Sequence, residues 1–144
     1  MKVLIDTNVI LDALMKREPW VRSAEAVLMA VAEEKVTGCI TASTFTDLYY
    51  LLRKRQLDKD LTRQTLLDLI AVVDVLDVTG TDCERAFDLP MRDYEDALLS
   101  YCAKRHRADR IITRNVNHFE GSPVVAVTPD EFLALQKDHP RRLV

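Results

Sequence analysis

The chain has 144 residues, of which 48% are hydrophobic and 30% charged, and this size and composition suit one compact domain. Lys and Arg total 20 against 23 Asp and Glu, so the formal net charge of -3 excludes a global cationic field, and any nucleic acid must be held by a local patch. With only 3 Gly and 5 Pro, disorder and low complexity are excluded and the chain is expected to fold throughout.

Short apolar runs alternate with amphipathic segments along the chain. In chain order we expect a strand at 3–5, a helix beginning near Val9, a helix from Trp20 to about Lys35, a strand at 39–41, helices at 45–54 and 62–73, a strand at 75–78, a helix at 81–89, a helix after Asp93, strands at 110–113 and 124–127, and a helix from Pro129. Strands separated by helices imply right-handed crossovers and a parallel sheet covered on both faces. The predicted fold class is α/β, a three-layer α/β/α sandwich, forming a single domain over 1–144 with a C-terminal tail at 136–144.

The sequence lacks the motifs of several enzyme classes. Its three glycines stand alone, which excludes a Walker loop and a dinucleotide-binding fingerprint. It has no GxSxG motif and no pair of histidines at helical zinc-site spacing, which excludes serine hydrolases of that type and zinc proteases. Three widely spaced cysteines disfavour a disulfide scaffold. The apolar run before Asp6 is too short for a signal peptide or a membrane span, so a cytoplasmic location is expected.

Several acidic residues follow predicted strands. In an open parallel sheet, ligands bind outside the carboxyl ends of the strands. Asp6 directly follows the first strand, Asp47 lies in the first turn of the helix after the second, and Asp93 and Asp96 open a later helix, so all four are predicted at one edge of the sheet. Asp109 precedes its strand and is predicted at the opposite edge. Five other acids within or between helices are expected at the solvated surface: Asp12, Asp58, Asp60, Asp68 and Asp88.

Each selected acid also has a structural interpretation. Asp6 or Asn8 is suited to cap the first helix, Asp93 is suited to cap the helix that it precedes, and Thr44 and Asp47 have capping-box spacing. Carboxylates gathered within about 4 to 6 Å repel one another unless a cation neutralises them, and oxygen-only ligands favour Mg2+ or Mn2+ over Zn2+. The candidate metal ligands are Asp6, Asp47, Asp93 and Asp96.

Polar and basic residues near the last strands have two interpretations. Asn115 offers a carbonyl oxygen to a metal-bound water or is a turn residue. The densest basic stretch is either a solvated helix end or a phosphate-binding patch beside the acids. Its candidate nucleic-acid-binding residues are Lys104, Arg107, Arg110 and Arg114. Trp20 and the Tyr49-Tyr50 pair are expected to pack in the core rather than to line a surface that binds a second protein chain.

Four blocks of the sequence together resemble the PIN domain family, over nearly the whole chain to about Leu135. They are Asp6-Thr7-Asn8-Val9-Ile10-Leu11, Thr46-Asp47-Leu48, Asp93-Tyr94-Glu95-Asp96-Ala97-Leu98 and Ile111-Ile112-Thr113-Arg114-Asn115. The resemblance is closest to the small single-domain prokaryotic members, which include VapC-type toxins. It implies an endoribonuclease that requires Mg2+ or Mn2+, forms a homodimer, is silenced by a small antitoxin, and leaves 5'-phosphate and 3'-hydroxyl ends.

The resemblance also assigns roles to residues. Asp6 and Asp96 match the first and third family carboxylates and are the expected principal metal ligands. Asp47 stands where many members carry Glu, and is expected to bind the metal or orient a bound water. Asn115 stands where many carry a fourth acid and is expected to position water, while the nearby Asp93 can supply the missing charge. Arg114, with the basic helix end, is expected to steer the RNA.

Three functional classes remain open at this point. The first is the metal-dependent ribonuclease. The second is a catalytically weak PIN scaffold that binds RNA or protein, which the departures at Asp47 and Asn115 motivate. The third is a phosphoryl-transfer domain of the receiver type, which also places acids at strand ends, although no acid adjoins Asp6 here.

Overall fold

The computed structural model describes residues 1–55 and 57–138 and contains a central sheet of five parallel strands. Its strands are β1 (Lys2–Ile5), β2 (Thr37–Thr41), β3 (Asp74–Leu76), β4 (Arg110–Ile112) and β5 (Ala126–Val127). Its helices are α1 (Thr7–Leu14), α2 (Val21–Ala32), α3 (Ala42–Lys54), α4 (Lys59–Ile70), α5 (Gly80–Arg85), α6 (Tyr94–Arg105) and α7 (Pro129–Asp138), with short 3-10 turns η1 (Ala86–Asp88) and η2 (Val116–Phe119). The predicted α/β/α sandwich with a parallel sheet is confirmed.

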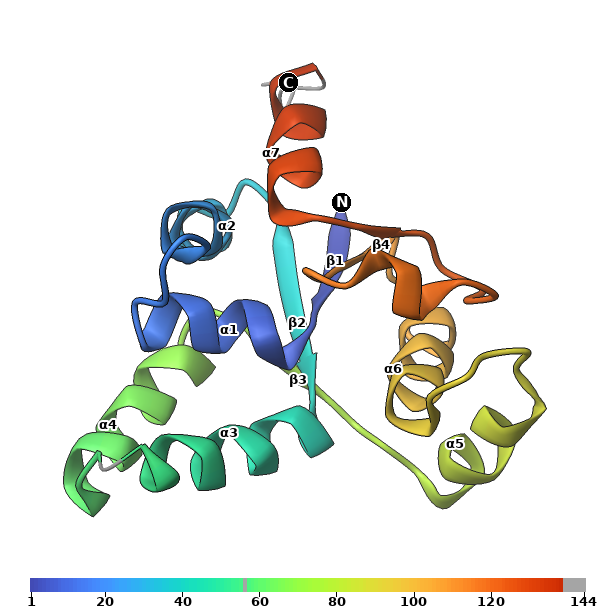
Figure 1. Ribbon diagram of the computed structural model, residues 1–144, viewed down its shortest axis with the longest axis horizontal. Coiled ribbons are helices and arrows are strands. Elements are labelled where there is room, and N and C mark those ends of the chain that lie inside the picture. Colours follow the sequence, from blue (N-terminus) through green and yellow to red (C-terminus); the bar gives the residue numbers. More distant parts are fainter. Residues whose placement is uncertain (56, 139–144) are drawn as a thin grey trace.

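The strand order in the sheet is β3-β2-β1-β4-β5, which puts β1 in the centre. Leu4 is the register partner of Cys39 on one side and of Ile111 on the other. All strands therefore end at the same edge, where β1 leads into α1 and β2 leads into α3 (Figure 1). Residues that follow β1, β2 and β4 consequently come together although they are far apart in the sequence.

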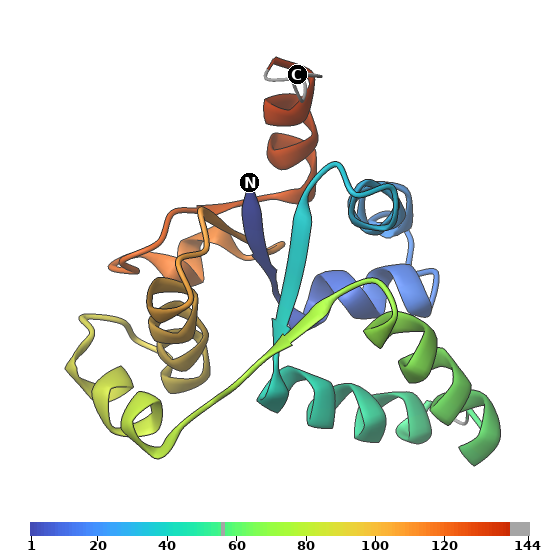
Figure 2. The same ribbon diagram turned by 180° about the vertical axis from the view of Figure 1, so that it is seen from behind.

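The strands are buried on both faces because their alternate side chains enter two different cores. Val3, Ile5 and Ile40 belong to the larger core, which α1, α2, α3, α4 and α7 cover. Leu4 and Ile111 belong to the smaller core on the other face, where they meet Leu99 of α6. The views from front and back show α1, α2, α3 and α4 on one side of the strands and α5 and α6 on the other (Figures 1 and 2).

Two helices begin earlier than predicted, because each directly follows a strand. Helix α1 begins at Thr7, with Asp6 as its N-cap. Helix α3 begins at Ala42, because the Thr41 hydroxyl accepts a hydrogen bond from the Thr44 backbone N–H at 3.2 Å. The predicted Thr44 and Asp47 capping box is therefore wrong, and Asp47 lies in the second turn rather than the first.

Other differences lie at the ends of elements. The helix predicted at 81–89 ends at Arg85 and continues as the 3-10 turn η1. Residues 136–138 of the predicted tail belong to α7, while the rest of that tail, 139–144, lies outside the described residues. No helix in the described part of the chain is long and apolar enough to cross a membrane.

Candidate active site

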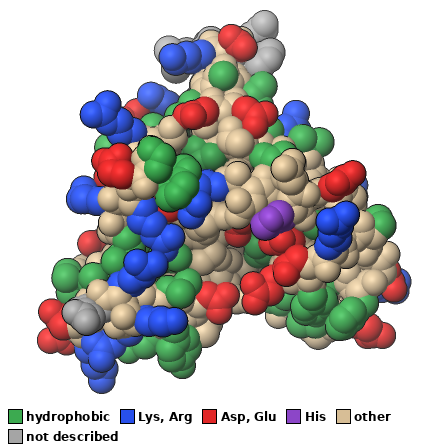
Figure 3. Space-filling view, viewed as in Figure 1, with side chains coloured by type: hydrophobic (Ala, Val, Ile, Leu, Met, Phe, Trp, Pro, Cys, Tyr) green, Lys and Arg blue, Asp and Glu red, His purple; other side chains and the backbone are tan. Residues whose placement is uncertain are grey.

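A cavity of about 710 Å³ opens at the carboxyl edge of the sheet, where α1, α3 and α6 begin. Its lining includes four of the residues predicted as catalytic: Asp6, Asp47, Asp96 and Asn115. The space-filling view shows a hollow at the centre of this face, with Lys and Arg side chains on its left and Asp and Glu side chains below and to its right (Figure 3). Three carboxylates and one amide therefore line a single cavity at the carboxyl ends of the strands, which we call the strand-end rule for ligand sites in parallel sheets.

Asp6 is the most buried of these acids and is held from two sides. Its Oδ2 accepts a hydrogen bond from the Thr113 hydroxyl at 2.9 Å, and its Oδ1 accepts one from the Thr7 backbone N–H at 2.8 Å. Burial raises the pKa of Asp6, and this effect outweighs the lowering by these two hydrogen bonds and by the charges of His118 and Arg114. The Asp6 carboxyl is oriented by the fold and would be stabilised by a nearby cation.

Asp96 lies in the first turn of α6 and faces the same cavity. Burial and the negative charges of Asp93 and Asp6 raise its pKa to about 6. His118 Nδ1 lies 3.9 Å from Asp96 Oδ2 and acts in the opposite direction. The coupling of Asp96 to Asp6 indicates two mutually repelling carboxyls, as expected of a site that binds a cation.

Asp93 has a different place from the other predicted metal ligands. Its Oδ1 accepts a hydrogen bond from the Asp96 backbone N–H at 3.0 Å, so Asp93 is the N-cap of α6, in agreement with its structural interpretation. It lines a neighbouring cavity, together with Arg92 and His118, rather than the cavity of Asp6. Asp93 thus influences the site through its charge on Asp96, and ligation of a metal by Asp93 stays a prediction.

The carboxylates share the cavity without forming a ready metal-binding cluster. Among the described residues, no group of three or more His, Cys, Asp or Glu side chains lies close enough together to hold a metal ion. The expected close convergence of four acids is therefore not fulfilled. Asp47 is exposed on the second turn of α3, whereas Asp6 is buried at the end of β1.

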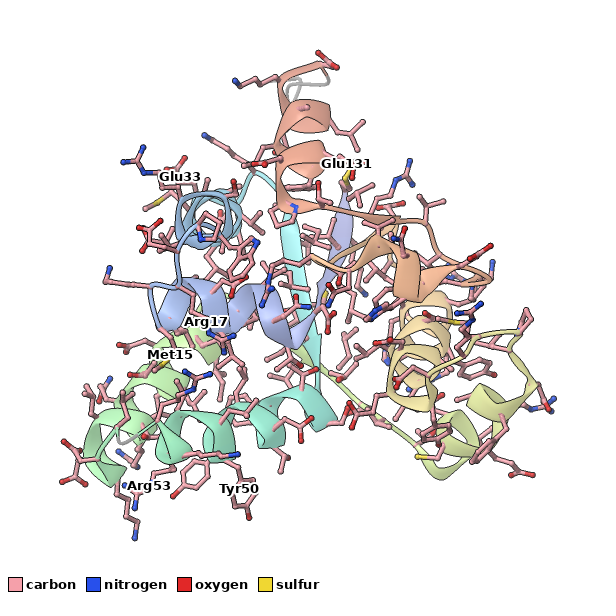
Figure 4. The ribbon with its side chains drawn as sticks, viewed as in Figure 1. Met15, Arg17, Glu33, Tyr50, Arg53 and Glu131 are labelled. Atoms are coloured by element: carbon pink, nitrogen blue, oxygen red, sulfur yellow. The ribbon has the colours of Figure 1, made fainter. Side chains whose placement is uncertain are left out.

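Asp12 is buried, so the prediction that it lies at the solvated surface is wrong. Its side chain is only 1% exposed, and its Oδ2 lies 2.7 Å from Arg114 Nε. Arg17 Nη1 lies 3.9 Å from its other oxygen. Arg17 itself lines the acidic cavity and is found where α1 faces α3 (Figure 4). One buried carboxylate thus forms ion pairs with two guanidinium groups near the candidate active site, of which only Arg114 was predicted there. Burial outweighs these two positive charges and raises the pKa of Asp12.

The other predicted RNA-binding cations do not reach this cavity. Lys104, Arg107 and Arg110 line a separate cavity of about 330 Å³ together with Asp109, at the edge of the sheet where the strands begin. Asp109 accepts a hydrogen bond from the Lys2 backbone N–H at 2.8 Å, which confirms that it lies at this opposite edge. Among the cations, Arg17 lines the acidic cavity, and Arg114, which directly precedes the lining residue Asn115, does not line it itself.

Two aromatic residues that were expected in the core are exposed. Trp20 is 41% exposed, and Tyr50 is 67% exposed and lines the acidic cavity from α3. Figure 4 shows Tyr50 on the lower side of α3. Tyr49 is partly buried and packs against the larger core, as expected.

Hydroxyl groups around Asp6 were not predicted to have roles. Thr113 directly follows β4, and its Oγ1 also accepts a hydrogen bond from the Asn115 backbone N–H at 3.1 Å. The Thr7 hydroxyl donates to Thr44 Oγ1 at 3.2 Å and so ties the start of α1 to α3. The strand-end rule that selected Asp6 applies equally to Thr113, and this signal was sufficient to find it.

Comparison with known proteins identifies the family. Residues 2–117 match the PIN domain, which is most of the chain. The chain belongs to the PIN domain family. The resemblance seen in the sequence is thus confirmed, and the alternative of a receiver-type phosphoryl-transfer domain loses its basis. Ribonuclease VapC1 of Aquifex aeolicus is 23% identical to this PIN domain over 136 residues, which cover 91% of the chain and 92% of the relative.

Solved structures have the same fold. VapBC2 from Rickettsia felis, bound to a DNA fragment from its promoter, aligns with a TM-score of 0.67 at 20% identity, over 89% of this PIN domain and 98% of the other chain. A toxin-antitoxin complex from Klebsiella pneumoniae aligns with a TM-score of 0.67 at 24% identity, over 88% and 97%. VapC20 of Mycobacterium tuberculosis, a toxin that cleaves the sarcin-ricin loop, aligns with a TM-score of 0.61 at 14% identity, over 76% and 86%.

Proposed function

We propose that this PIN domain is a divalent-metal-dependent endoribonuclease. The observation that carries the proposal is the pairing of Asp6 and Asp96, two largely buried carboxyls with raised pKa values in one cavity, where the negative charge of Asp6 raises the pKa of Asp96. The match to the PIN domain and the relation to a VapC ribonuclease support it.

The donor set fits Mg2+ or Mn2+. All candidate ligands in the cavity are oxygens, and Mg2+ keeps several waters, so it needs only one or two direct carboxylates rather than a preformed cage. Asp6 and Asp96 would hold the ion. When bound, it lowers the pKa of a coordinated water and stabilises the charge that develops on the phosphodiester.

Residues of the chain would then position the Asp6 carboxyl, the attacking water and the phosphate. Thr113 and the Thr7 backbone N–H keep the Asp6 carboxyl in one orientation. Asp47 and Asn115 line the cavity and would orient the attacking water. Arg114 supplies positive charge for the phosphate. Hydrolysis breaks the bond between phosphorus and O3', leaving a 5'-phosphate and a 3'-hydroxyl. Lys104, Arg107 and Arg110 would contact only RNA that extends to the opposite edge of the sheet.

The test is cleavage of RNA by purified protein in Mg2+ or Mn2+, with chelator as the metal-free comparison. We expect cleavage that chelator stops, and a loss of about a hundredfold or more in Asp6→Asn and Asp96→Asn. Asp60→Asn is the matched control, because Asp60 is exposed on α4 and does not line the cavity. Cleavage that survives both substitutions in folded protein contradicts the proposal. RNA binding without turnover in either metal favours the binding-module alternative.

We further propose that the protein is the toxin of a toxin-antitoxin pair, silenced by a small antitoxin and acting as a homodimer. The structures of the Klebsiella pneumoniae complex and of VapBC2 motivate this part of the proposal. Induced expression in a bacterial host is expected to arrest growth, and Asp96→Asn at equal protein level is expected not to. Growth that is unaffected by active enzyme contradicts a toxin role. The mass in solution, measured by light scattering, tests the dimer.

A further inference from the structure

His118 lies next to the candidate metal ligands and has no role in the function proposed so far. Its Nδ1 lies 3.9 Å from Asp96 Oδ2, and its side chain is 62% exposed, against 15% for Asp96. Asp96 lines the acidic cavity and His118 lines the neighbouring one, so this pair of side chains connects the two cavities. Burial raises the pKa of both Asp6 and Asp96, and a charge on the His118 ring acts in the opposite direction on both. The imidazole ring is therefore close to both carboxyls.

The backbone of His118 is fixed by the segment that also holds Asp6. His118 lies in η2, and its backbone N–H donates a hydrogen bond to the Asn115 carbonyl at 2.9 Å. The Asn115 N–H in turn donates to Thr113, the residue that holds the Asp6 carboxyl. Phe119, the next residue along η2, is buried in the smaller core. The fold thus sets the place of His118 relative to the acids, while its ring, which makes no hydrogen bond to a described residue, has a nitrogen available to a ligand.

The spacing of Asp96 and His118 suits one shared ion. A small divalent ion bonds to carboxylate oxygen or imidazole nitrogen at about 2.0 to 2.2 Å, so two atoms on one octahedral ion lie between about 3 Å and about 4 Å apart. The distance of 3.9 Å falls within this range and is too long for a hydrogen bond between the two side chains. Because the described residues contain no ready group of three such side chains, water would fill the other positions on the ion.

We propose that His118 is a ligand of the divalent ion that Asp96 binds, and that its nitrogen makes the site prefer a first-row transition ion such as Mn2+ over Mg2+. Imidazole nitrogen is a common ligand of transition ions, whereas Mg2+ is held through oxygen. The inference rests on the proposed metal-dependent function and adds the class of ion that the site selects. In the competing role, His118 only offsets the charge of Asp96 and does not touch the ion.

Nitrogen ligation is measured directly in the metal-loaded protein. Calorimetric titration of the full chain with Mn2+ and, separately, with Mg2+ gives the two affinities. Pulsed electron paramagnetic resonance of the Mn2+ form detects nitrogen nuclei bonded to the ion, and protein labelled with 15N only in histidine assigns such a signal to imidazole. We expect a histidine signal in the wild type and tighter binding of Mn2+ than of Mg2+. Neither measurement depends on RNA cleavage.

Two histidine variants separate ligation from other effects. His118→Gln is expected to lose the histidine signal and to bind Mn2+ about tenfold or more weakly. Its affinity for Mg2+ is expected to change by about twofold or less, because a water takes the place of the nitrogen on Mg2+. His106→Gln is the matched control, since the His106 ring lies 3.1 Å from the Asp77 carbonyl at the end of α6 remote from Asp96, and it is expected to keep the signal and both affinities. Melting temperatures verify folding.

The outcomes distinguish the ligand role from the proposed function. Mn2+ binding without a histidine signal, a signal that persists in His118→Gln, or equal changes of Mn2+ and Mg2+ affinity in that variant overturns the inference and leaves the ribonuclease proposal intact. If the wild type binds neither ion, the metal dependence of the proposed function fails, and the inferred ion preference fails with it.

Discussion

The hydroxyl of Thr113 donates a hydrogen bond to the carboxylate of Asp6, at 2.9 Å from Oγ1 to Oδ2. The two residues follow β4 and β1, which are neighbours in the sheet. The Asp6 backbone N–H also donates a hydrogen bond to the Ile112 carbonyl oxygen at 2.9 Å, which extends the pairing of these two strands. Both side chains are buried, so the bond is shielded from water. The position of the most buried acid of the site is thus set by a residue from the other end of the chain.

Replacement of Thr113 by Val is expected to destabilise the protein by about 1–3 kcal/mol, because a buried Asp6 oxygen loses its donor. The pKa of Asp6 is expected to rise further, and the affinity for divalent metal to fall. Urea unfolding measures the first effect and calorimetric titration with Mn2+ the second. Thr113→Ser retains the hydroxyl and is expected to remain close to wild type in metal affinity. Equal metal affinity in the Val and Ser variants would show that the hydroxyl has no role in the site.

Much of the candidate site was predictable from the sequence. The carboxyl ends of parallel strands lie at one edge of the sheet, and applying this rule requires only that the strands are recognised. It placed Asp6, Asp96 and Asn115 at one cavity without any knowledge of packing. The rule did not fix distances, because these depend on the helical turn that carries each acid: Asp47 lies in the second turn of α3 and Asp96 in the first turn of α6. The sequence therefore predicted which acids share the cavity, but not that they stop short of a metal cluster.

The failures concern residues whose environment is set by distant parts of the chain. Asp12 was expected at the solvated surface, because the sequence does not show that Arg114 and Arg17 come within ion-pair distance of it. Lys104 follows Asp96 closely in sequence, but both lie on α6, whose 12 residues span about 18 Å and connect opposite edges of the sheet. Proximity along a helix therefore did not mean proximity in the site.

Replacement of Asp12 by Asn is expected to cost about 1–3 kcal/mol of unfolding free energy, because the arginines lose the charge that orients them. The matched control Asp60→Asn, at an exposed position, is expected to stay within about 0.5 kcal/mol of wild type. Chemical unfolding compares the two variants. A cost for Asp12→Asn no larger than that of the control would mean that the two guanidinium groups do not depend on this carboxylate.

The pKa of about 6 for Asp96 predicts an unusual pH dependence of the metal-free protein. The ordinary value is 3.8, so between about pH 4 and about pH 6 the folded state binds more protons at Asp96 than the unfolded state does. The contribution of Asp96 to stability therefore falls as the pH rises through this window. Divalent metal requires the ionised carboxyl, so metal affinity is expected to rise over the same window.

The predicted effect of Asp96 on stability is tested by melting temperatures measured in chelator at about pH 4.5 and about pH 7.5. We expect Asp96→Asn to gain stability relative to wild type on going to the higher pH, because the amide carries no charge that Asp93 and Asp6 can repel. Some pH dependence remains in the variant, since burial also raises the pKa of Asp6. Parallel curves for wild type and variant would contradict the raised pKa of Asp96.

Arg105 provides a test of stability away from the candidate site. Its Nε and Nη2 donate to the two oxygens of the fully buried Asp82, each at 2.7 Å, and thereby fasten α5 to α6. Burial alone would raise the pKa of Asp82, but the hydrogen bonds from Arg105 and Thr79 outweigh it and hold the pKa below its ordinary value. This pair therefore contributes stability above about pH 4, which is lost as the pH falls through the lowered pKa.

Lys cannot reproduce the two parallel hydrogen bonds of a guanidinium group, so Arg105→Lys is expected to cost about 2–3 kcal/mol at neutral pH and less in acid. Lys104→Ala is the matched control, because Lys104 is the exposed neighbour on α6 and is expected to change stability by about 0.5 kcal/mol or less. Urea unfolding at neutral and acidic pH measures both variants. A cost for Arg105→Lys that does not shrink in acid would show that the Asp82 carboxylate is not what the guanidinium group stabilises.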